Sequence, residues 1–262
     1  MYAMERHEHI LDTLGRDGRV SVAELADELQ VTAETIRRDL DTLERTGHVR
    51  RVHGGAVSAS RASLAETTVL ERESHRMEPK RSIARAALAL VPPTFTGSIL
   101  LDAGTTTGAL AEALAGWRPG PGTAALIVYT NSVPIAARLV ANPELVVRII
   151  GGTVRGITSA AVGPTAVAQL ADIRPDIAFL GTNGLSAEFG FSTPDELEAQ
   201  VKRTMVDRSR LVVVLVDASK HDDEALHRFA CLDEVDVVIT DAIPGPALAE
   251  ALVEAEVEVR LA

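Results

Sequence analysis

The stretch TAETIRRDL, residues 32–40, combines helical apolar spacing with hydroxyl and basic side chains. Ile36, Leu40 and then Leu43 recur at intervals of three and four residues, which predicts a helix with one buried face. Thr32 stands where an N-cap is expected. The residues predicted to face outward are Thr35, Arg37 and Arg38. Because hydroxyl and guanidinium groups bind DNA bases and phosphates, the stretch predicts a DNA recognition helix.

Two shorter helical patterns precede this helix. Residues 5–15 and 22–30 each carry apolar positions on one side, and RDGR at 16–19 predicts a turn between them. Ser21 and Glu24 have the spacing of a capping box, in which each side chain bonds to a backbone amide of the other residue. The three segments together predict a helix-turn-helix with an extra leading helix.

A hairpin pattern follows. HVRRVHGGAVS, residues 48–58, alternates around Gly54 and Gly55, which is typical of two strands joined by a glycine turn. The basic residues expected to contact the DNA backbone or minor groove are Arg50, Arg51 and His53. Residues 1–57 are therefore predicted to form a winged helix-turn-helix. Winged helices also bind proteins, but the paired arginines favour DNA.

The charge of the chain limits where DNA can bind. The 262 residues carry a formal net charge of −11, which argues against a general polyanion-binding surface. Residues 31–57 hold five arginines against four acidic residues, so the DNA-binding surface must be local. The single cysteine excludes an internal disulfide, and seven scattered histidines show no ligand spacing, so we expect neither metal nor cofactor.

No apolar run approaches the roughly 20 residues that span a bilayer. We therefore expect a cytoplasmic protein with no membrane partner. The polar stretch 58–78 predicts a linker, which becomes helical towards the next domain.

Residues 79–262 alternate short aliphatic runs with helix-length segments. The runs are SILLDAG, ALIVYTN, LVVRIIGG, DIAFLGTNG, RLVVVLVDASK, VDVVITD and VEVRLA. This alternation predicts an α/β domain with a mainly parallel sheet, covered by helices on both faces. In such sheets, ligands bind at the carboxyl ends of the strands.

The first of those strand ends leads into a glycine- and threonine-rich loop. Its candidate ligand residues are Gly104, Thr105, Thr106 and Thr107. Amides and hydroxyls at a helix N-terminus can hold a phosphate, although an ordinary glycine turn with a threonine cap fits equally well. Lys202 and Lys220 are candidate cations for that phosphate, unless they are simply solvated charges.

Polar residues follow the first strand and several of the others. Those that could hydrogen-bond the hydroxyls of a polyol, or form local turns instead, are Asp102, Asn131, Asn183 and Asp217. Gly152 and Gly184 lie in the loops of two such strand ends. No nucleophile elbow or P-loop is present, which leaves a binding site as the main expectation.

Taken in order, these motifs resemble one family. TIRRDL, then RRVHGGA, then LDAGTTTGALAEAL, TNSVPIAARL, GGTVR, GTNGLSAEFGFSTPDELEAQVKRTM and DASK together resemble the DeoR-type bacterial transcription regulators. Their sensor domain is similar to ribose-phosphate isomerases, and family members commonly respond to phosphorylated sugars. The resemblance implies a repressor of a carbohydrate operon, with phosphate at residues 104–107 and the sugar at Asp102, Asn131 and Asn183.

The same resemblance allows an alternative, a sugar-phosphate isomerase with an accessory N-terminal domain. An isomerase needs a carboxylate base in the loop corresponding to GTNG, where this chain has Asn183, which cannot accept a proton at neutral pH. We therefore expect a sensor and no enzyme. Fructose 1-phosphate is the first candidate effector. A homodimer or homotetramer is expected, because a single small DNA-binding domain seldom binds operator DNA tightly enough.

Overall fold

The computed structural model places two compact units, residues 1–65 and residues 66–262, and each is described here by itself. The structure describes residues 3–17, 19–45, 49–52, 54–58 and 76–262. None of the helices within those ranges is both long and apolar enough to cross a membrane.

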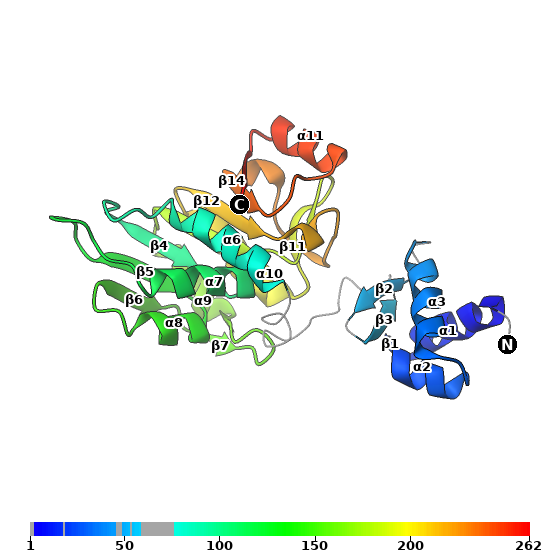
Figure 1. Ribbon diagram of the computed structural model, residues 1–262. Helices are drawn as coiled ribbons and strands as arrows, with labels where there is room; N and C mark the ends of the chain where they lie inside the picture. Colours follow the sequence, from blue (N-terminus) through cyan, green and yellow to red (C-terminus); the bar gives the residue numbers. More distant parts are fainter. Residues whose placement is uncertain (1–2, 18, 46–48, 53, 59–75) are drawn as a thin grey trace. The chain divides into compact units, whose positions relative to one another are not determined.

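The first unit is a winged helix-turn-helix (Figure 1). Its elements are α1 (Ala3–Asp17), β1 (Arg19–Ser21), α2 (Val22–Glu28), α3 (Ala33–Arg45), β2 (Val49–Val52) and β3 (Gly55–Ser58). The strands form one antiparallel sheet in the order β1-β3-β2. Ile36 and Leu40 of α3 are fully buried against Ile10 and Leu14 of α1, so the apolar spacing of residues 32–43 correctly predicted the inner face of the helix.

Two local predictions for this unit are wrong. The stretch 16–19 is not a simple turn, because Arg19 already pairs with Val57 as the first residue of β1. Ser21 precedes α2, yet its side chain makes no capping hydrogen bond.

Gly55 is needed where β1 lies against β3, since a Cβ there would lie 1.8 Å from the carbonyl oxygen of Val20. The close approach of β1 therefore depends on glycine.

The second unit contains a seven-stranded sheet in the order β15-β14-β12-β9-β4-β5-β6, with every pair parallel. Its strands are β4 (Ser98–Leu101), β5 (Leu126–Thr130), β6 (Leu145–Ile149), β9 (Ile177–Gly181), β12 (Val212–Val216), β14 (Val237–Thr240) and β15 (Glu258–Leu261). All seven aliphatic runs of the sequence became these strands, which confirms the predicted α/β class.

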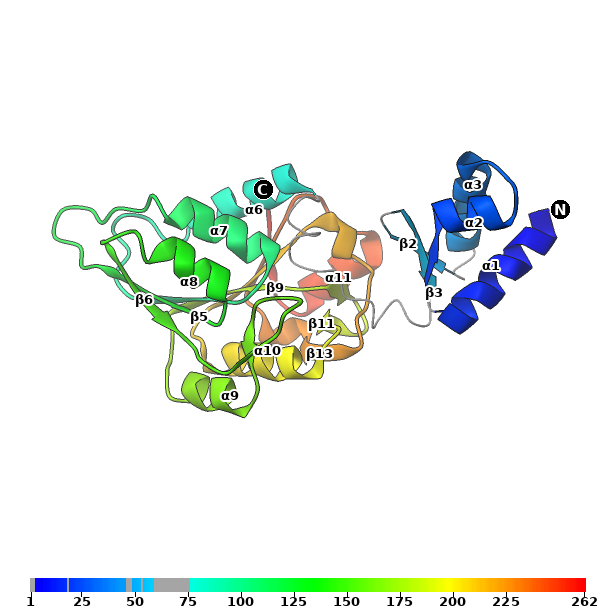
Figure 2. The same ribbon diagram turned by 90° about the horizontal axis from the view of Figure 1, so that it is seen from below.

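Helices cover both faces of this sheet (Figure 2). On one face lie α6 (Met77–Leu88), α7 (Thr105–Leu114) and α8 (Val133–Leu139), and on the other lie α9 (Pro164–Ala171), α10 (Glu196–Arg208) and α11 (Pro246–Glu254). Leu101 faces the first layer and Leu100 the second, as alternation along a strand requires. Pro79 is the third residue of α6, not the first, because the helix already begins at Met77 within the predicted linker.

Smaller elements, which the sequence did not predict, lie outside the large sheet. They are the hairpin β7 (Thr153–Val154) and β8 (Ala161–Val162), the three antiparallel strands β10 (Gly184–Ser186), β11 (Gly190–Thr193) and β13 (His227–Ala230), and the short 3-10 helices η1 (Ala218–Lys220) and η2 (Leu232–Glu234). Their runs are two to four residues long, too short for a periodic pattern to be visible.

An ion pair ties η2 to α10 and predicts how acid affects this unit. Arg203 donates to both carboxylate oxygens of Glu234 at 2.6 Å, and this contact lowers the pKa of Glu234 to about 2. A depressed carboxyl pKa adds stability above about pH 4.5 that is lost as the pH falls towards 2. Solvent screens the pair, so Glu234→Gln should lower the free energy of unfolding by about 1 kcal/mol at pH 7.

Urea unfolding followed by the fluorescence of Trp117, the sole tryptophan, measures this effect. The difference between wild type and Glu234→Gln should shrink between pH 7 and pH 3. An equal difference at both values would show that the carboxylate charge contributes nothing.

Candidate functional site

The outer surface of α3 carries the predicted recognition residues. Arg37 and Arg38 are exposed, and Thr35 is half-buried. Thr32 Oγ1 accepts from the amide of Thr35 at 3.2 Å, so the predicted cap forms. Arg37 lies 3.2 Å from Glu34, a solvated pair that an incoming phosphate can displace. This face of α3 therefore presents two guanidinium groups and a hydroxyl to solvent.

Asp39 lies on the opposite face of α3. Its carboxylate is buried and accepts from Arg6 Nε at 2.7 Å and from Arg6 Nη2 at 3.0 Å, with His7 Nε2 at 3.1 Å. The pair joins α3 to α1 and fixes the angle at which the helix presents its arginines. This acidic residue of the TIRRD motif thus positions the helix and lies away from the surface that carries Arg37 and Arg38.

The wing strands form as expected, with Arg50 opposite Val57 and Arg51 opposite Ala56. The side chains of both arginines, and the whole of His53, lie outside what the structure describes. Their contacts with DNA therefore stay a prediction.

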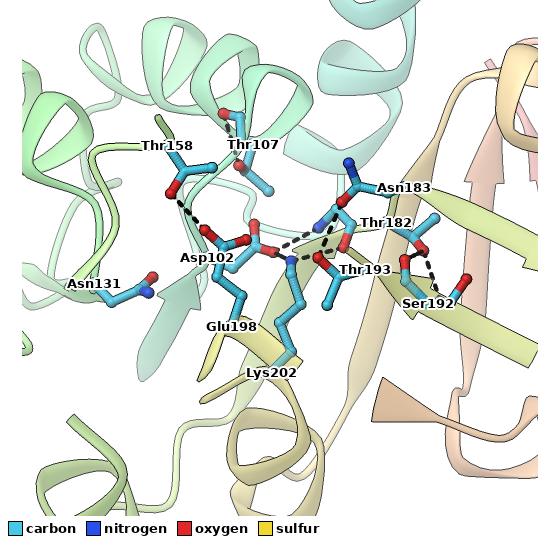
Figure 3. A network of polar contacts seen from close by, with 12 residues as sticks. Asp102, Thr107, Asn131, Thr158, Thr182, Asn183, Ser192, Thr193, Glu198 and Lys202 are labelled. Atoms are coloured by element: carbon cyan, nitrogen blue, oxygen red, sulfur yellow. Dashed lines mark hydrogen bonds and ion pairs between the residues drawn. The ribbon is translucent and has the colours of Figure 1, made fainter. Parts of the chain in front are cut away.

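In the second unit, the strand order reverses at β4. The chain runs outward from β4 to β5 and β6, then returns to β9 on the other side of β4. Asp102 follows β4 and Gly181 ends β9, so both stand at the switch point where doubly wound sheets bind ligands. The GTTT loop opens α7 directly beside them (Figure 3).

Asp102 and Lys202 form a buried pair at this point (Figure 3). Lys202 Nζ donates to Asp102 Oδ2 and, at 2.9 Å, to the carbonyl of Gly181, and it lies 5.3 Å from the centre of the Phe229 ring. Burial raises the pKa of Asp102, although Lys202 opposes the shift. Lys202 is only 5% exposed and is surrounded by partners, so it is not a solvated charge.

A second buried carboxylate lies one helical turn earlier on α10. Glu198 accepts from Arg155 Nη1 at 2.6 Å and from Thr158 Oγ1 at 2.5 Å, and Arg155 also lies 3.2 Å from Asp195. Both donors belong to the loop between β7 and β8. Glu198 therefore holds that loop over the end of the sheet (Figure 3).

A pocket of about 440 Å³ lies beside this network, between α6, α7, α8 and the β7–β8 loop. Its polar or charged lining residues are Lys80, Arg81, Thr105, Glu112, Ser132, Arg138 and Thr158, and Gly104 contributes backbone. Three cationic side chains thus stand against one carboxylate, next to the amino end of α7. The arrangement favours a small anion.

Only part of the predicted ligand set lines this pocket. Gly104 and Thr105 do, whereas Thr106 and Thr107 are buried in the first turn of α7, where Thr107 donates to the carbonyl of Gly104 at 3.1 Å. Asn131 is buried behind the pocket and donates to Ala161. Its Oδ1, like Oδ1 of Asp102, has no hydrogen-bond partner within the described ranges.

The remaining candidates stand further along the sheet edge. Asn183 accepts from Thr193 at 3.2 Å, and Asp217 accepts from the amide of Ser219 at 3.1 Å. Lys220 is half-buried in η1 and does not line the pocket.

Two predicted glycines have a packing reason. A Cβ on Gly152 would lie 2.5 Å from the carbonyl oxygen of Val162, and one on Gly184 would lie 2.5 Å from that of Asp223. Both positions therefore allow close backbone contacts.

The sequence reading missed the cations of the pocket. Lys80 and Arg81 belong to α6, upstream of the first strand, and Arg138 lies on α8. Lys80 is 7% exposed, which is unusual for lysine. A signal existed in PKRSIARAALALV, where a lysine falls on the same side as the buried Ile83, Ala84 and Ala87.

Comparison with known proteins agrees with this architecture. The family described as the DeoR-like helix-turn-helix domain matches residues 6–62, and the DeoR C terminal sensor domain matches residues 75–242. Among solved structures, a D-ribose-5-phosphate isomerase in complex with phospho-erythronic acid aligns at 15% identity and a TM-score of 0.40, over 55% of this chain and 53% of that one. A superposition this loose carries no functional argument.

Curated relatives match along nearly their whole length. HTH-type transcriptional regulator GlpR of Haloferax volcanii is 39% identical over 92% of this chain and 91% of its own. The glycerol-3-phosphate regulon repressor of Escherichia coli is 29% identical over the full length of both chains. FruR of Bacillus subtilis is 35% identical over 92% of each. With both halves matched in order, the protein belongs to the DeoR family and is a DNA-binding transcriptional regulator.

Proposed function

We propose that this regulator represses a carbohydrate operon and that a phosphorylated sugar, bound in the α6–α7–α8 pocket, changes its affinity for operator DNA. The pocket carries this proposal, because it joins the first turn of α7 to Lys80, Arg81 and Arg138. Free amides at a helix N-terminus and charge-assisted donors are the two devices that bind phosphate most strongly. A volume of about 440 Å³ suits a sugar phosphate.

The neighbouring strand ends supply acceptors for sugar hydroxyls. Oδ1 of Asp102 and Oδ1 of Asn131 are buried without a hydrogen-bond partner among the described residues. A buried acceptor without a donor is costly, so a hydroxyl that reaches either oxygen gains a strong contact. We assign the phosphate to Lys80, which lines the pocket, in preference to Lys202 and Lys220, which do not.

The same geometry supports sensing in preference to catalysis. Asn183 provides no base, and the nearby carboxylate of Glu198 is engaged by Arg155 and Thr158. A pentose phosphate and hexose phosphate isomerase assay tests the alternative enzyme. Turnover would overturn the assignment.

On the DNA side, we propose that Thr35, Arg37 and Arg38 read the major groove and that the β2–β3 hairpin contacts the flanking backbone. A homodimer or homotetramer supplies two or more DNA-binding domains. The protein acts in the cytoplasm, where bacterial operators lie. Fructose 1-phosphate and glycerol 3-phosphate are the first effectors to test, the latter because a relative is named for its regulon.

The experiment starts with selection from a random duplex DNA library by the purified full chain. Enrichment of one repeated or palindromic motif is expected, and Arg37→Ala should weaken binding to that motif by about 1–3 kcal/mol. The selected duplex is then titrated in the presence of sugar phosphates and of the free sugars. One phosphorylated sugar should change the DNA affinity, while its free form should not. A library without enrichment would refute operator recognition, and no response to any phosphate would refute the effector class.

A further inference from the structure

Strand β6 leaves one side of the large sheet open. It bonds to β5 only, and Figures 1 and 2 both show it along the margin of the sheet. Among the described residues, no strand pairs with its outer side. Glu144 and Ile150 bond to β5, so by alternation the carbonyl groups of Leu145 and Val147 and the amide of Val147 point outward, while the amide of Leu145 donates to the carbonyl of Asn142 at 3.2 Å. An open edge of this kind is a template for another strand.

The side chains of this edge are complementary to their own copy. Glu144, Val146 and Arg148 share one face of the strand, because side chains alternate. In an antiparallel pair centred on Val146, Glu144 faces Arg148 of the second copy, Arg148 faces Glu144, and Val146 faces Val146. These are non-hydrogen-bonded pairs. In such pairs the facing side chains approach each other most closely.

We propose that β6 pairs antiparallel with β6 of a second copy of this chain, in the register that places Glu144 opposite Arg148 twice. The proposal deepens the self-association proposed above, since it names the surface involved. The amide of Val147 then donates to the carbonyl of Leu145 in the second copy, and symmetry supplies the reciprocal bond. Pro143, which has no amide hydrogen, stops the pairing beyond Ile149 and so disfavours longer or shifted registers. The interface is isologous and closes on two copies.

Exposed apolar side chains also lie at this edge. Of the twelve large apolar side chains that the described residues expose, Val146 and Ile149 lie on β6, Val133 is the first residue of α8, which packs against β6, and Val140 follows the last residue of α8. Strand pairing alone buries little area, and these side chains extend the apolar surface available to a second copy.

The opposite edge of the sheet shows the contrast. On β15, Arg260 bonds to both oxygens of Glu258 at 2.7 and 3.0 Å within the same strand. Those two charges therefore pair within one strand. On β6, the guanidinium of Arg148 lies over Tyr129 and uses one donor on its hydroxyl, at 3.0 Å. Its remaining donors can reach a carboxylate of the second copy.

Charge reversal with rescue tests the pairing. Sedimentation equilibrium of the full chain gives the dissociation constant of the dimer. Arg148→Glu should raise it by at least about tenfold, because two attractive pairs become two repulsive ones. Glu144→Arg should do the same. The double variant Glu144→Arg/Arg148→Glu swaps the charges and should return the constant to within about threefold of wild type.

Arg260→Glu is the matched control, because it makes the same change of charge on the other edge strand and should leave the dimer intact. A monomeric wild type, an unchanged dimer in Arg148→Glu, or a double variant no tighter than the single ones would overturn the pairing. The same variants are assayed for sugar-phosphate binding. If Arg148→Glu stays dimeric while effector binding persists, the β6 interface fails and the proposed function stands; if no sugar phosphate binds, the proposed function fails whatever the dimer does.

Discussion

Replacing Asp39 with alanine is expected to lower the free energy of unfolding of the N-terminal unit by about 3 kcal/mol, because it leaves Arg6 buried without its carboxylate. The Arg6 and Asp39 side chains are 12% and 8% exposed, and the contact is bidentate. A unit of about 65 residues has a small core, so a loss of this size removes much of its stability. Operator binding should fall with it, although Asp39 lies away from the surface that carries Arg37 and Arg38.

The chain offers a way to assign that loss to the right unit. Its sole tryptophan, Trp117, is buried in the second unit, where its indole donates to the carbonyl of Val91. In urea, far-UV circular dichroism reports helices of both units, while tryptophan fluorescence reports the second alone. Asp39→Ala should move part of the dichroism transition to lower urea and leave the fluorescence midpoint unchanged.

Glu34→Ala is the matched control. Glu34 is an acidic residue on the same helix that pairs with Arg37. Its side chain is 72% exposed, so its loss should lower the free energy of unfolding by less than about 0.5 kcal/mol. Equal effects of the two substitutions would show that burial of the Arg6 contact contributes nothing.

Asp39 also shows what periodicity could not reveal. The spacing of Ile36, Leu40 and Leu43 correctly predicted the buried stripe of α3, because apolar burial repeats every three or four residues. The same periodicity predicts that a polar residue beside that stripe faces outward. Its burial depends on Arg6, 33 positions away, and that contact exists only once α1 packs on α3.

The sheet was predictable for a similar reason. Continuous aliphatic runs separated by helix-length segments allow few arrangements other than a parallel sheet with two helical layers. The short strands β7 to β8 and β10 to β11 were missed, since they are held by tertiary contacts such as those of Glu198 with Arg155.

The same contrast between local sequence patterns and tertiary contacts applies to the candidate site. The position of the GTTT loop after the first strand follows from local sequence and was predicted correctly, whereas the strand order that makes β4 the switch point came only from the folded sheet. The cations that surround the loop were not predicted, because α6 precedes the first strand and meets α7 only in the folded chain. Lys202 was predicted as a cation for the phosphate, but its contact with Asp102 spans 100 positions and could not be predicted from local sequence.

Lys80 provides the sharpest test of the proposed effector site. Lys80→Met keeps most of the side-chain volume and removes the ammonium group that lines the pocket. A buried, charge-assisted contact with phosphate contributes about 1.5–3 kcal/mol, so affinity for the effector should fall about tenfold to a hundredfold. Isothermal titration with the sugar phosphate identified in the screen measures this loss. The effector concentration that alters DNA binding should rise by the same factor, because linkage is reciprocal.

Two lysines serve as controls for that result. Lys220→Met changes the same residue type outside the pocket lining and should leave effector affinity unchanged. Lys202→Met removes the partner of the buried Asp102 and should lower stability, seen as a lower urea midpoint of Trp117 fluorescence. If Lys220→Met weakened the effector and Lys80→Met did not, the phosphate would lie at the β12 end of the sheet, and the pocket between α6 and α8 would not be the sensor site.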